Sequence, residues 1–288
     1  MNTIFTHFRK FTFFFALIIG SLVFTQCEGP LSSTDSDTGR LLLKLTDDPF
    51  PTNMVEEANV TIDKVEIRRA NAEEDGDDNP FTVLTEKDTT LNLLDLTNGV
   101  TATLADLEIE AGSYDLIRLY ISDASVKLIG ENEPRTMKVP SGAQTGLKIF
   151  VDPAIDVAGG LTAELLLDIN VSKSFVVQGN PNTPAGIRGF IFKPVIRASN
   201  QSTSGRINGT ISDGSGNPLE DAEVWVTKAD TVYSSTFSDS TGFYALIGLP
   251  EGDYNLHGTA TDFDTTTVEN VTVTAGNETT EDLTINEL

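Results

Sequence analysis

Hydrophobic and polar residues alternate with a period of two along most of the chain after residue 39. In residues 59–68, valine and isoleucine occupy every second position, but the phase changes at Asp63 and Lys64. Alternation of this kind is typical of β-strands with one buried face, and a change of phase predicts a bulge. Apolar residues at helical spacing are hard to find, so the pattern predicts an all-β protein.

The strand-like segments fall into two groups separated by a polar break at residues 199–204. They are short, rich in β-branched and aromatic residues, and bounded by Gly, Pro, Asn and Asp. We therefore predict two β-sandwich domains in tandem, 40–198 and 205–288, joined by the linker 199–204, with about seven strands in the second. The expected strands of the second domain are 205–212, 222–227, 234–238, 242–246, 252–257, 268–273 and 281–285.

The N-terminus reads as an export signal. Arg9 and Lys10 precede an apolar run that ends at Gln26 and Cys27, and the run is shorter than the roughly 20 residues needed to span a bilayer. Residues 1–26 resemble the signal peptide of a bacterial lipoprotein, in which the cysteine becomes the acylated first residue. Gln26 departs from the small residue usual before that cysteine, and the alternative is an ordinary cleaved signal with an incidental cysteine. We favour lipidation because no other small-residue cleavage site follows and a lone thiol has no disulfide partner.

Residues 27–39 are small, polar and acidic, which predicts a flexible acidic tether. We expect an exported, lipid-anchored protein of the cell envelope, held in the outer membrane of a Gram-negative bacterium. Its contact with the membrane would be the lipid on Cys27.

Acidic residues dominate the composition, with 43 Asp and Glu against 19 Lys and Arg and a net charge of −24. Removal of the signal takes away Arg9 and Lys10 and brings the net charge from −24 to −26. Such a charge repels nucleic acid, so no nucleic-acid partner is expected. A solvated acidic surface is the favoured interpretation of these residues.

The second predicted domain carries several turn-and-strand motifs in a fixed order. Residues 209–224, 238–244 and 249–256 resemble the carboxypeptidase regulatory-like domain. The resemblance implies a transthyretin-like, Ig-like seven-stranded sandwich that is usually non-catalytic, and several members of the superfamily bind carbohydrate or act as spacers.

The first predicted domain contains a second ordered set of segments, which covers about 40–197 and consists of residues 45–49, 60–65, 93–99, 111–119, 139–148, 165–168 and 193–195. In these segments it resembles the bacterial domain of unknown function 4382, which is common in secreted lipoproteins and brings no known activity. Both domains contain a Gly-x-Tyr-x-Leu pattern, beginning at Gly112 and at Gly252. Two related sandwiches in tandem and convergence on one strand-start pattern both explain it.

No catalytic residue or cofactor is expected. His257 is the one histidine after the signal, and Cys27 is the one cysteine, which excludes a zinc site built from Cys and His. A satisfied strand histidine is the favoured interpretation of His257. A hydrolase with a pair of carboxyls is the least supported alternative, because nothing in the sequence selects two particular acids.

Two loops are candidate ligand sites. Residues 73–79 contain five acids, and Asp75, Asp77 and Asp78 are weak calcium candidates, although their spacing does not match a calcium-binding loop and an exposed acidic loop tip is favoured. Residues 139–146 form a neutral, hydroxyl-rich loop. The side chains that could bind a sugar or a peptide there are Ser141, Gln144, Thr145 and Lys148, and the alternative is a structural crossover loop.

The leading functional hypothesis is a non-catalytic, lipid-anchored envelope protein used for binding, adhesion or display. Its partner would be a polysaccharide or an envelope protein. Capture of a polysaccharide requires an aromatic platform in which at least two rings face solvent together, and Trp225 has the core as an alternative location. The candidate platform residues are Trp225, Tyr233, Phe237 and Tyr244.

Overall fold

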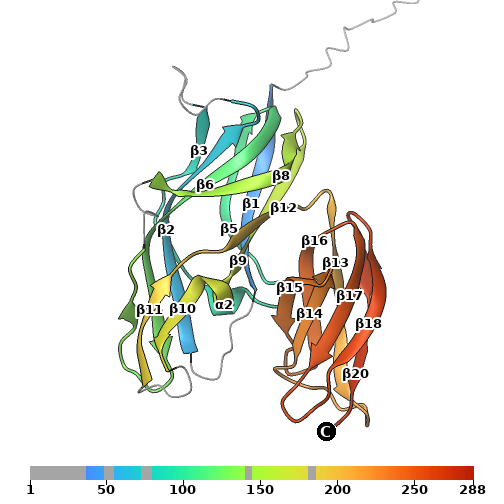
Figure 1. Ribbon diagram of the computed structural model, residues 1–288. Coiled ribbons are helices and arrows are strands. Elements are labelled where there is room, and N and C mark those ends of the chain that lie inside the picture. Colours follow the sequence, from blue (N-terminus) through green and yellow to red (C-terminus); the bar gives the residue numbers. More distant parts are fainter. Residues whose placement is uncertain (1–36, 49–54, 73–79, 140–144, 181–185) are drawn as a thin grey trace, which may run out of the picture. The chain divides into compact units, whose positions relative to one another are not determined.

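The computed structural model describes residues 37–48, 55–72, 80–139, 145–180 and 186–288. Most of these residues lie in β-strands, so the predicted all-β fold is confirmed. Within these ranges no helix has the length and apolar character needed to cross a membrane. Asp35–Leu288 forms one compact unit, in which two sandwiches follow one another along the chain (Figure 1).

The first sandwich consists of two sheets and a hairpin. One sheet has the strand order β12-β9-β1-β5; the other has the order β3-β2-β6-β7, with β4 also paired to β2 and β8 to β6; β10 and β11 pair with each other. The elements are β1 (Thr38–Asp48), β2 (Val55–Arg69), β3 (Phe81–Thr85), β4 (Thr89–Asn92), η1 (Leu93–Leu96), β5 (Ala102–Glu110), β6 (Gly112–Leu128), β7 (Arg135–Thr136), β8 (Leu147–Val157), β9 (Thr162–Asn170), α2 (Val171–Ser174), β10 (Phe175–Gly179), β11 (Ile187–Phe192) and β12 (Ile196–Asn200).

The core of the first sandwich follows the alternation in the sequence. Leu41, Leu43 and Leu45 of β1 are fully buried in one cluster with residues of β2, β6 and β9. The predicted bulge in β2 is confirmed, because the pairing with β6 skips Asp63 between Ile62 and Lys64. The extra residue returns the next apolar side chains of β2 to the core.

The second sandwich also has two sheets. One has the order β15-β14-β17-β18, and the other has the order β16-β13-β19, with β20 also paired to β13. The elements are β13 (Ser204–Asp213), β14 (Glu223–Lys228), β15 (Thr231–Phe237), β16 (Phe243–Pro250), β17 (Gly252–Thr259), β18 (Thr266–Val273), β19 (Glu278–Thr280) and β20 (Leu283–Ile285). Since β12 ends at Asn200 and β13 begins at Ser204, only residues 201–203 connect the sandwiches.

The predicted seventh strand of this sandwich, at 281–285, is shorter in the structure, where β20 begins at Leu283, and β19 precedes it as a strand that was not predicted. Between them, the carbonyl oxygen of Glu281 accepts a hydrogen bond from the hydroxyl of Tyr244, and the carboxylate of Asp282 accepts one from the N–H of Thr210 at 2.8 Å. The N–H of Glu281 still donates to the carbonyl oxygen of Asn208 at 2.8 Å, so the side-chain bonds add to backbone pairing at the break between the two strands.

The two sandwiches share a common strand arrangement. In the first, β1 lies between the antiparallel β5 and the parallel β9; in the second, β13 lies between the antiparallel β16 and the parallel β19 and β20. The other sheet of the first sandwich, β3-β2-β6-β8, corresponds to β15-β14-β17-β18 of the second. Both are antiparallel, and their strands follow one another along the chain in the same order. The likeness therefore extends far beyond the Gly-x-Tyr pattern and favours two related sandwiches.

The Gly-x-Tyr pattern itself adopts one geometry in both places. The hydroxyl of Tyr114 donates to the carbonyl oxygen of Glu110 at 2.7 Å, and that of Tyr254 donates to the carbonyl oxygen of Pro250 at 2.8 Å. Gly112 (φ 156°) and Gly252 (φ 146°) precede them in a backbone conformation that favours glycine. Each buried tyrosine thus ties the start of its strand to the end of the preceding one.

Replacing either tyrosine by phenylalanine removes this bond and leaves a carbonyl without its partner. We expect Tyr114→Phe and Tyr254→Phe each to lower the free energy of unfolding by about 1 kcal/mol, measured by urea denaturation of the chain from residue 28 onward. Tyr233→Phe is the matched control, because the hydroxyl of Tyr233 makes no hydrogen bond within the part of the chain that the structure describes, and it should change stability little. Equal effects of all three variants would contradict the assigned role of the two bonds.

Three aspartates of the second sandwich are held as carboxylates, Asp213 and Asp239 in turns and Asp282 against β13. Hydrogen bonds, first from a neighbouring side chain and then from backbone N–H groups, keep the pKa of each carboxyl below its usual value of 3.8. The side-chain bonds are Asn217 Nδ2 to Asp213 at 2.8 Å, Thr241 Oγ1 to Asp239 at 2.7 Å and Thr210 Oγ1 to Asp282 at 2.8 Å.

Because these pKa values are lowered in the folded protein, the carboxylates stabilise it above pH 3.8. That contribution is lost as the pH falls through the lower folded pKa. We expect Asp239→Asn to reduce the loss of stability on acidification from pH 5 to pH 3, measured by urea unfolding at each pH. Asp264→Asn, at an exposed aspartate outside this set of three, should leave the pH profile unchanged. A profile that Asp239→Asn does not alter would contradict the role given to its carboxylate.

Candidate functional site

Asn98 joins the two sandwiches. It lies in the loop after η1 with φ 56°, a left-handed conformation that asparagine tolerates. Its Nδ2 donates to the carbonyl oxygen of Phe243 at 3.2 Å, its Oδ1 accepts from the N–H of Ala245 at 2.6 Å, and its own N–H donates to Thr236 Oγ1 at 3.1 Å. Phe243 and Ala245 belong to β16, the edge strand of its sheet. The carboxamide therefore pairs with this edge much as a neighbouring strand would.

Arg197 on β12 makes a second connection. Its guanidinium donates to Oδ2 of the buried Asp168 at 2.5 Å and to the carbonyl oxygen of Tyr233, and it lies 4.0 Å from the centre of the Tyr233 ring. Two residues further on, Ser199 Oγ donates to the carbonyl oxygen of Gly248 on β16 at 3.0 Å. The sandwiches are thus joined by side chains of the first as well as by the chain itself.

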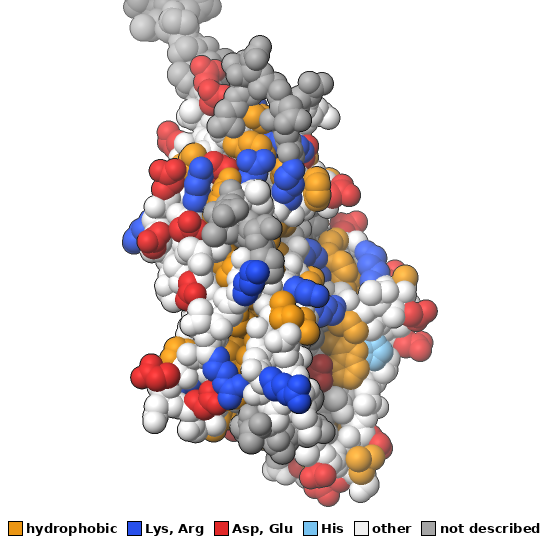
Figure 2. Space-filling view, turned by 60° about the vertical axis from the view of Figure 1, so that its left-hand side comes forward, with side chains coloured by type: hydrophobic (Ala, Val, Ile, Leu, Met, Phe, Trp, Pro, Cys, Tyr) orange, Lys and Arg blue, Asp and Glu red, His pale blue; other side chains and the backbone are white. Residues whose placement is uncertain are grey.

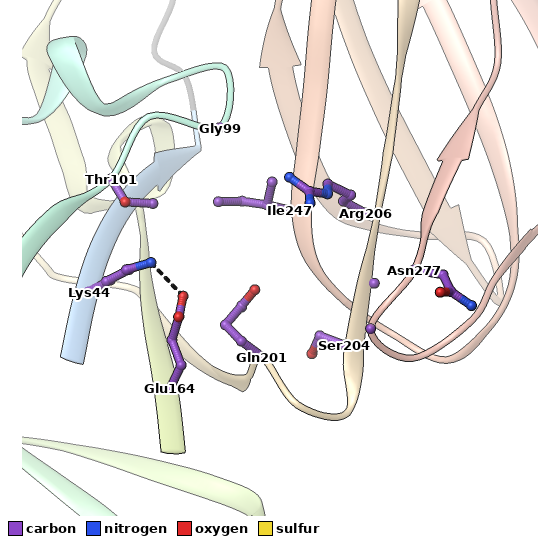
Figure 3. A pocket seen from close by; sticks show the side chains of 11 residues that line it. Lys44, Gly99, Thr101, Glu164, Gln201, Ser204, Arg206, Ile247 and Asn277 are labelled. Carbon is purple, nitrogen blue, oxygen red and sulfur yellow. Dashed lines mark hydrogen bonds and ion pairs between the residues drawn. The ribbon is translucent and has the colours of Figure 1, made fainter. Parts of the chain in front are cut away.

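A cleft of about 310 Å³ opens between the sandwiches (Figure 3). Lys44 on β1 and Glu164 on β9 line the side of the first sandwich, and Arg206 on β13 and Asn277 before β19 line the side of the second. Gln201 lies in the connection and lines the cleft between them. This volume is at the small end of the roughly 300–1,000 Å³ range of ligand pockets.

The charges in the cleft wall occur in pairs. Lys44 Nζ lies 2.7 Å from Glu164 Oε1, and Arg206 Nε lies 3.1 Å from Glu278 Oε2. Each positive charge is therefore offset by a negative charge of its own sandwich, in a protein with a net charge of −24. The cleft offers polar groups without a large net charge.

The Gln201 side chain points into the cleft between the Lys44–Glu164 pair and Arg206 (Figure 3). Its main-chain N–H donates to the carbonyl oxygen of Glu164 at 3.0 Å, and this bond fixes the position of the Gln201 main chain. Its Nε2 is buried and has no hydrogen-bond partner among the described residues. A buried donor without a partner costs free energy, so this amide is the least satisfied group in the wall.

The residues predicted from sequence lie elsewhere or outside the described ranges. Cys27, the calcium candidates Asp75, Asp77 and Asp78, and the loop residues Ser141 and Gln144 fall outside the described residues. Thr145 is exposed, and Lys148 on β8 stands opposite Arg118 of β6; neither lines the cleft.

Lys148 and Arg118 belong to the outer face of the β3-β2-β6-β8 sheet. The Arg118 guanidinium lies 3.7 Å from the centre of the Phe81 ring. On the face shown in Figure 2, Lys and Arg side chains gather toward the middle and most Asp and Glu side chains lie toward the margins. The basic residues of this acidic protein are therefore not spread evenly.

The predicted aromatic platform is only partly available. Tyr244 is fully buried in the core, so its inclusion was wrong. Tyr233 packs edge-to-face against Tyr254 at 5.8 Å and lies under Arg197. Trp225 and Phe237 remain, and both are half-buried on the outer face of the β15-β14-β17-β18 sheet. Phe237 of β15 pairs with Glu223 of β14, and Trp225 lies two residues after Glu223 on β14.

His257 is a satisfied strand histidine, as predicted. Its Nε2 hydrogen-bonds with Thr227 Oγ1 at 3.0 Å and its Nδ1 with Thr267 Oγ1 at 2.9 Å. Its ring stacks on Trp225 with centroids 5.1 Å apart, and burial lowers its pKa. Both ring nitrogens are engaged with hydroxyls of the same sheet face.

Sequence reasoning missed the cleft because its walls come from segments far apart in the chain. Gln201 and Ser204 were interpreted only as part of a polar linker, and Lys44 and Glu164 as ordinary strand residues. The available signal was the alternation itself: in β1 and β9, these two charged side chains stand among apolar residues, on strands that pair with each other.

Family models match both halves of the chain, which confirms the predicted two-domain resemblance. The model described as a domain of unknown function (DUF4382) matches residues 38–194, and the carboxypeptidase regulatory-like domain matches residues 206–286. No curated protein matches the chain.

Solved structures give weak similarities. The Bacillus anthracis TIE protein is 16% identical with TM-score 0.25, over 88% of this chain and 34% of that one. The minor pilin GBS52 of Streptococcus agalactiae is 11% identical with TM-score 0.25, over 86% and 96% of the two chains. The shaft pilin SpaA of Lactobacillus rhamnosus GG is 11% identical with TM-score 0.26, over 87% and 98%. At these TM-scores the similarities carry no argument about function.

Loss of the Asn98 carboxamide should weaken the connection between the sandwiches. We expect Asn98→Ala to lower the free energy of unfolding by about 1–3 kcal/mol, because the Phe243 carbonyl and the Ala245 N–H lose their partner. Proteolysis within residues 201–203 should also become faster, measured by limited digestion and mass spectrometry. Asn132→Ala, at an exposed asparagine away from the joint, is the control. Unchanged cleavage in the Asn98 variant would contradict the role of this residue.

Proposed function

Because the chain belongs to the DUF4382 family and carries a carboxypeptidase regulatory-like domain behind that region, we propose that it is a non-catalytic binding protein of the bacterial cell envelope. A lipid on Cys27 would hold it to the outer membrane. The observation that carries the binding role is the polar cleft whose two walls come from the two sandwiches.

Support for the anchor comes from the sequence. A basic and then apolar segment precedes Cys27, and a small, acidic stretch separates this cysteine from β1. Fully extended, residues 28–37 span at most about 35 Å. The folded unit would therefore stay close to the membrane surface.

Support for binding comes from the way the cleft is built. Its two walls belong to different sandwiches, and hydrogen bonds of Asn98 and Arg197 connect these. A site whose walls are already in place loses less conformational entropy when a ligand binds. Binding sites are often found between domains for this reason.

A non-catalytic role agrees with the state of the groups that chemistry would require. The His257 nitrogens both bond to threonines. Glu164 in the cleft wall bonds to Lys44, and Glu278, next to Asn277 of the wall, bonds to Arg206. An acid-pair hydrolase needs two carboxyls that face one scissile bond, and this alternative has no support from the cleft.

Capture of a polysaccharide is the finer form of the proposal, with an envelope protein as the other ligand class. The half-buried Trp225 and Phe237 stand at diagonal positions on one sheet face, a spacing at which two aromatic side chains can contact one ligand. They are the remaining part of the aromatic platform considered above, and they compete with the cleft as the place where a sugar would bind.

The anchor is tested by expressing the full chain in a Gram-negative host with an alkyne-labelled fatty acid. Wild-type protein should incorporate the label and sediment with membranes, and Cys27→Ser should do neither, because the serine hydroxyl does not replace the acylated thiol. Ser33→Ala is the control within the tether and should behave as wild type. Label retained by Cys27→Ser, or absent from wild type, would refute the anchor.

A further inference from the structure

We propose that the cleft between the sandwiches binds an uncharged sugar unit of a polysaccharide, with the Gln201 amide as its central contact. The inference rests on the proposed binding function and names the ligand class and the residue of that same site. It follows from the charge balance, the hydrogen-bonding groups, the state of the Gln201 amide and the shape of the cleft.

The charge balance selects a neutral ligand. Lys44 and Arg206 are both paired with carboxylates of their own sandwich, at 2.7 and 3.1 Å. A charged ligand would compete with one partner of each pair for the other. A ligand without charge leaves both pairs as they are, and it meets no large net charge of either sign.

The hydrogen-bonding groups suit vicinal hydroxyls. Gln201 and Asn277 each offer a donor and an acceptor in one plane, and Thr101 and Ser204 add hydroxyls. A sugar hydroxyl likewise donates and accepts at once, so adjacent hydroxyls of one ring can pair with the two ends of an amide. Apolar or purely accepting ligands would leave half of these groups without partners.

The Gln201 amide is ready for such a ligand. Its Nε2 has no hydrogen bond among the described residues, so rotation of the amide about its last torsion breaks none there. The main chain at Gln201 is meanwhile fixed by the bond to Glu164. The side chain can therefore turn either its oxygen or its nitrogen toward a ligand while its main chain stays in place. A hydrogen bond formed with the ligand then replaces no hydrogen bond within the described protein.

The shape of the cleft completes the match. Ile247 provides an apolar wall on the side of the second sandwich, against which the C–H face of a sugar ring can pack (Figure 3). Gly99, Gly205 and Gly276 leave parts of the wall without side chains. At about 310 Å³ the cleft accepts a short part of a glycan, with the rest of the chain in solvent.

The test uses the chain from residue 28 onward and measures binding by calorimetry and affinity electrophoresis. The neutral probes are an α-glucan, a β-1,3-glucan, a mannan and a xylan, and the acidic probes are polygalacturonate and alginate. We expect saturable binding of at least one neutral glycan. Gln201→Ala and Gln201→Glu should each weaken it at least tenfold, while their urea unfolding profiles remain close to wild type.

Two controls locate the site. Gln178→Ala removes an exposed glutamine of β10 away from the cleft and should leave binding unchanged, as should Trp225→Ala on the outer sheet face. Binding of acidic glycans alone, binding of no neutral glycan, or neutral binding that depends on Trp225 but not on Gln201 would each overturn the inference. None of these results would change the outcome of fatty-acid labelling at Cys27, so the two proposals fail separately.

Discussion

The free edge of β16 is the constraint on which the arrangement of the described chain depends. An edge strand exposes backbone donors and acceptors that would otherwise pair with another chain. Here Asn98 bonds to the carbonyl oxygen of Phe243 and the N–H of Ala245, and Ser199 bonds to the carbonyl oxygen of Gly248. Covering this edge brings the first sandwich against the second, and the cleft is the space left beside these contacts.

Part of the connection between the sandwiches comes from β12, a strand that the second sandwich lacks. The strand that corresponds to β16 is β5, and the common part of each sandwich is a pair of sheets tied by a tyrosine at Gly-x-Tyr. The first sandwich additionally has β12, which pairs with β9 and carries Arg197 and Ser199. β12 has no counterpart in the second sandwich, and yet it carries two of the side chains that connect the sandwiches. The similarity of the two sandwiches would therefore not have revealed this connection.

Ion pairing limits the net charge that the cleft presents to a ligand. The protein carries 43 acidic residues, and a solvated carboxylate on an open surface needs no partner. In the cleft wall Glu164 is instead paired with Lys44, and Arg206 is paired with Glu278, which follows Asn277 of the wall. The first pair is partly buried and the second is exposed, so the wall presents dipoles and hydroxyls beside two ion pairs.

The sequence by itself determined the all-β class, the bulge at Asp63, the presence of two sandwiches and the role of His257. These follow from alternation and turn residues, because successive side chains of a strand point to opposite faces whatever the tertiary structure. Only the tertiary structure decided that Tyr244 is buried and that Lys44, Gln201 and Arg206 line one cleft. Alternation shows which side chains share a face, but which face another sheet covers, and which distant segments meet, is set by packing over long range.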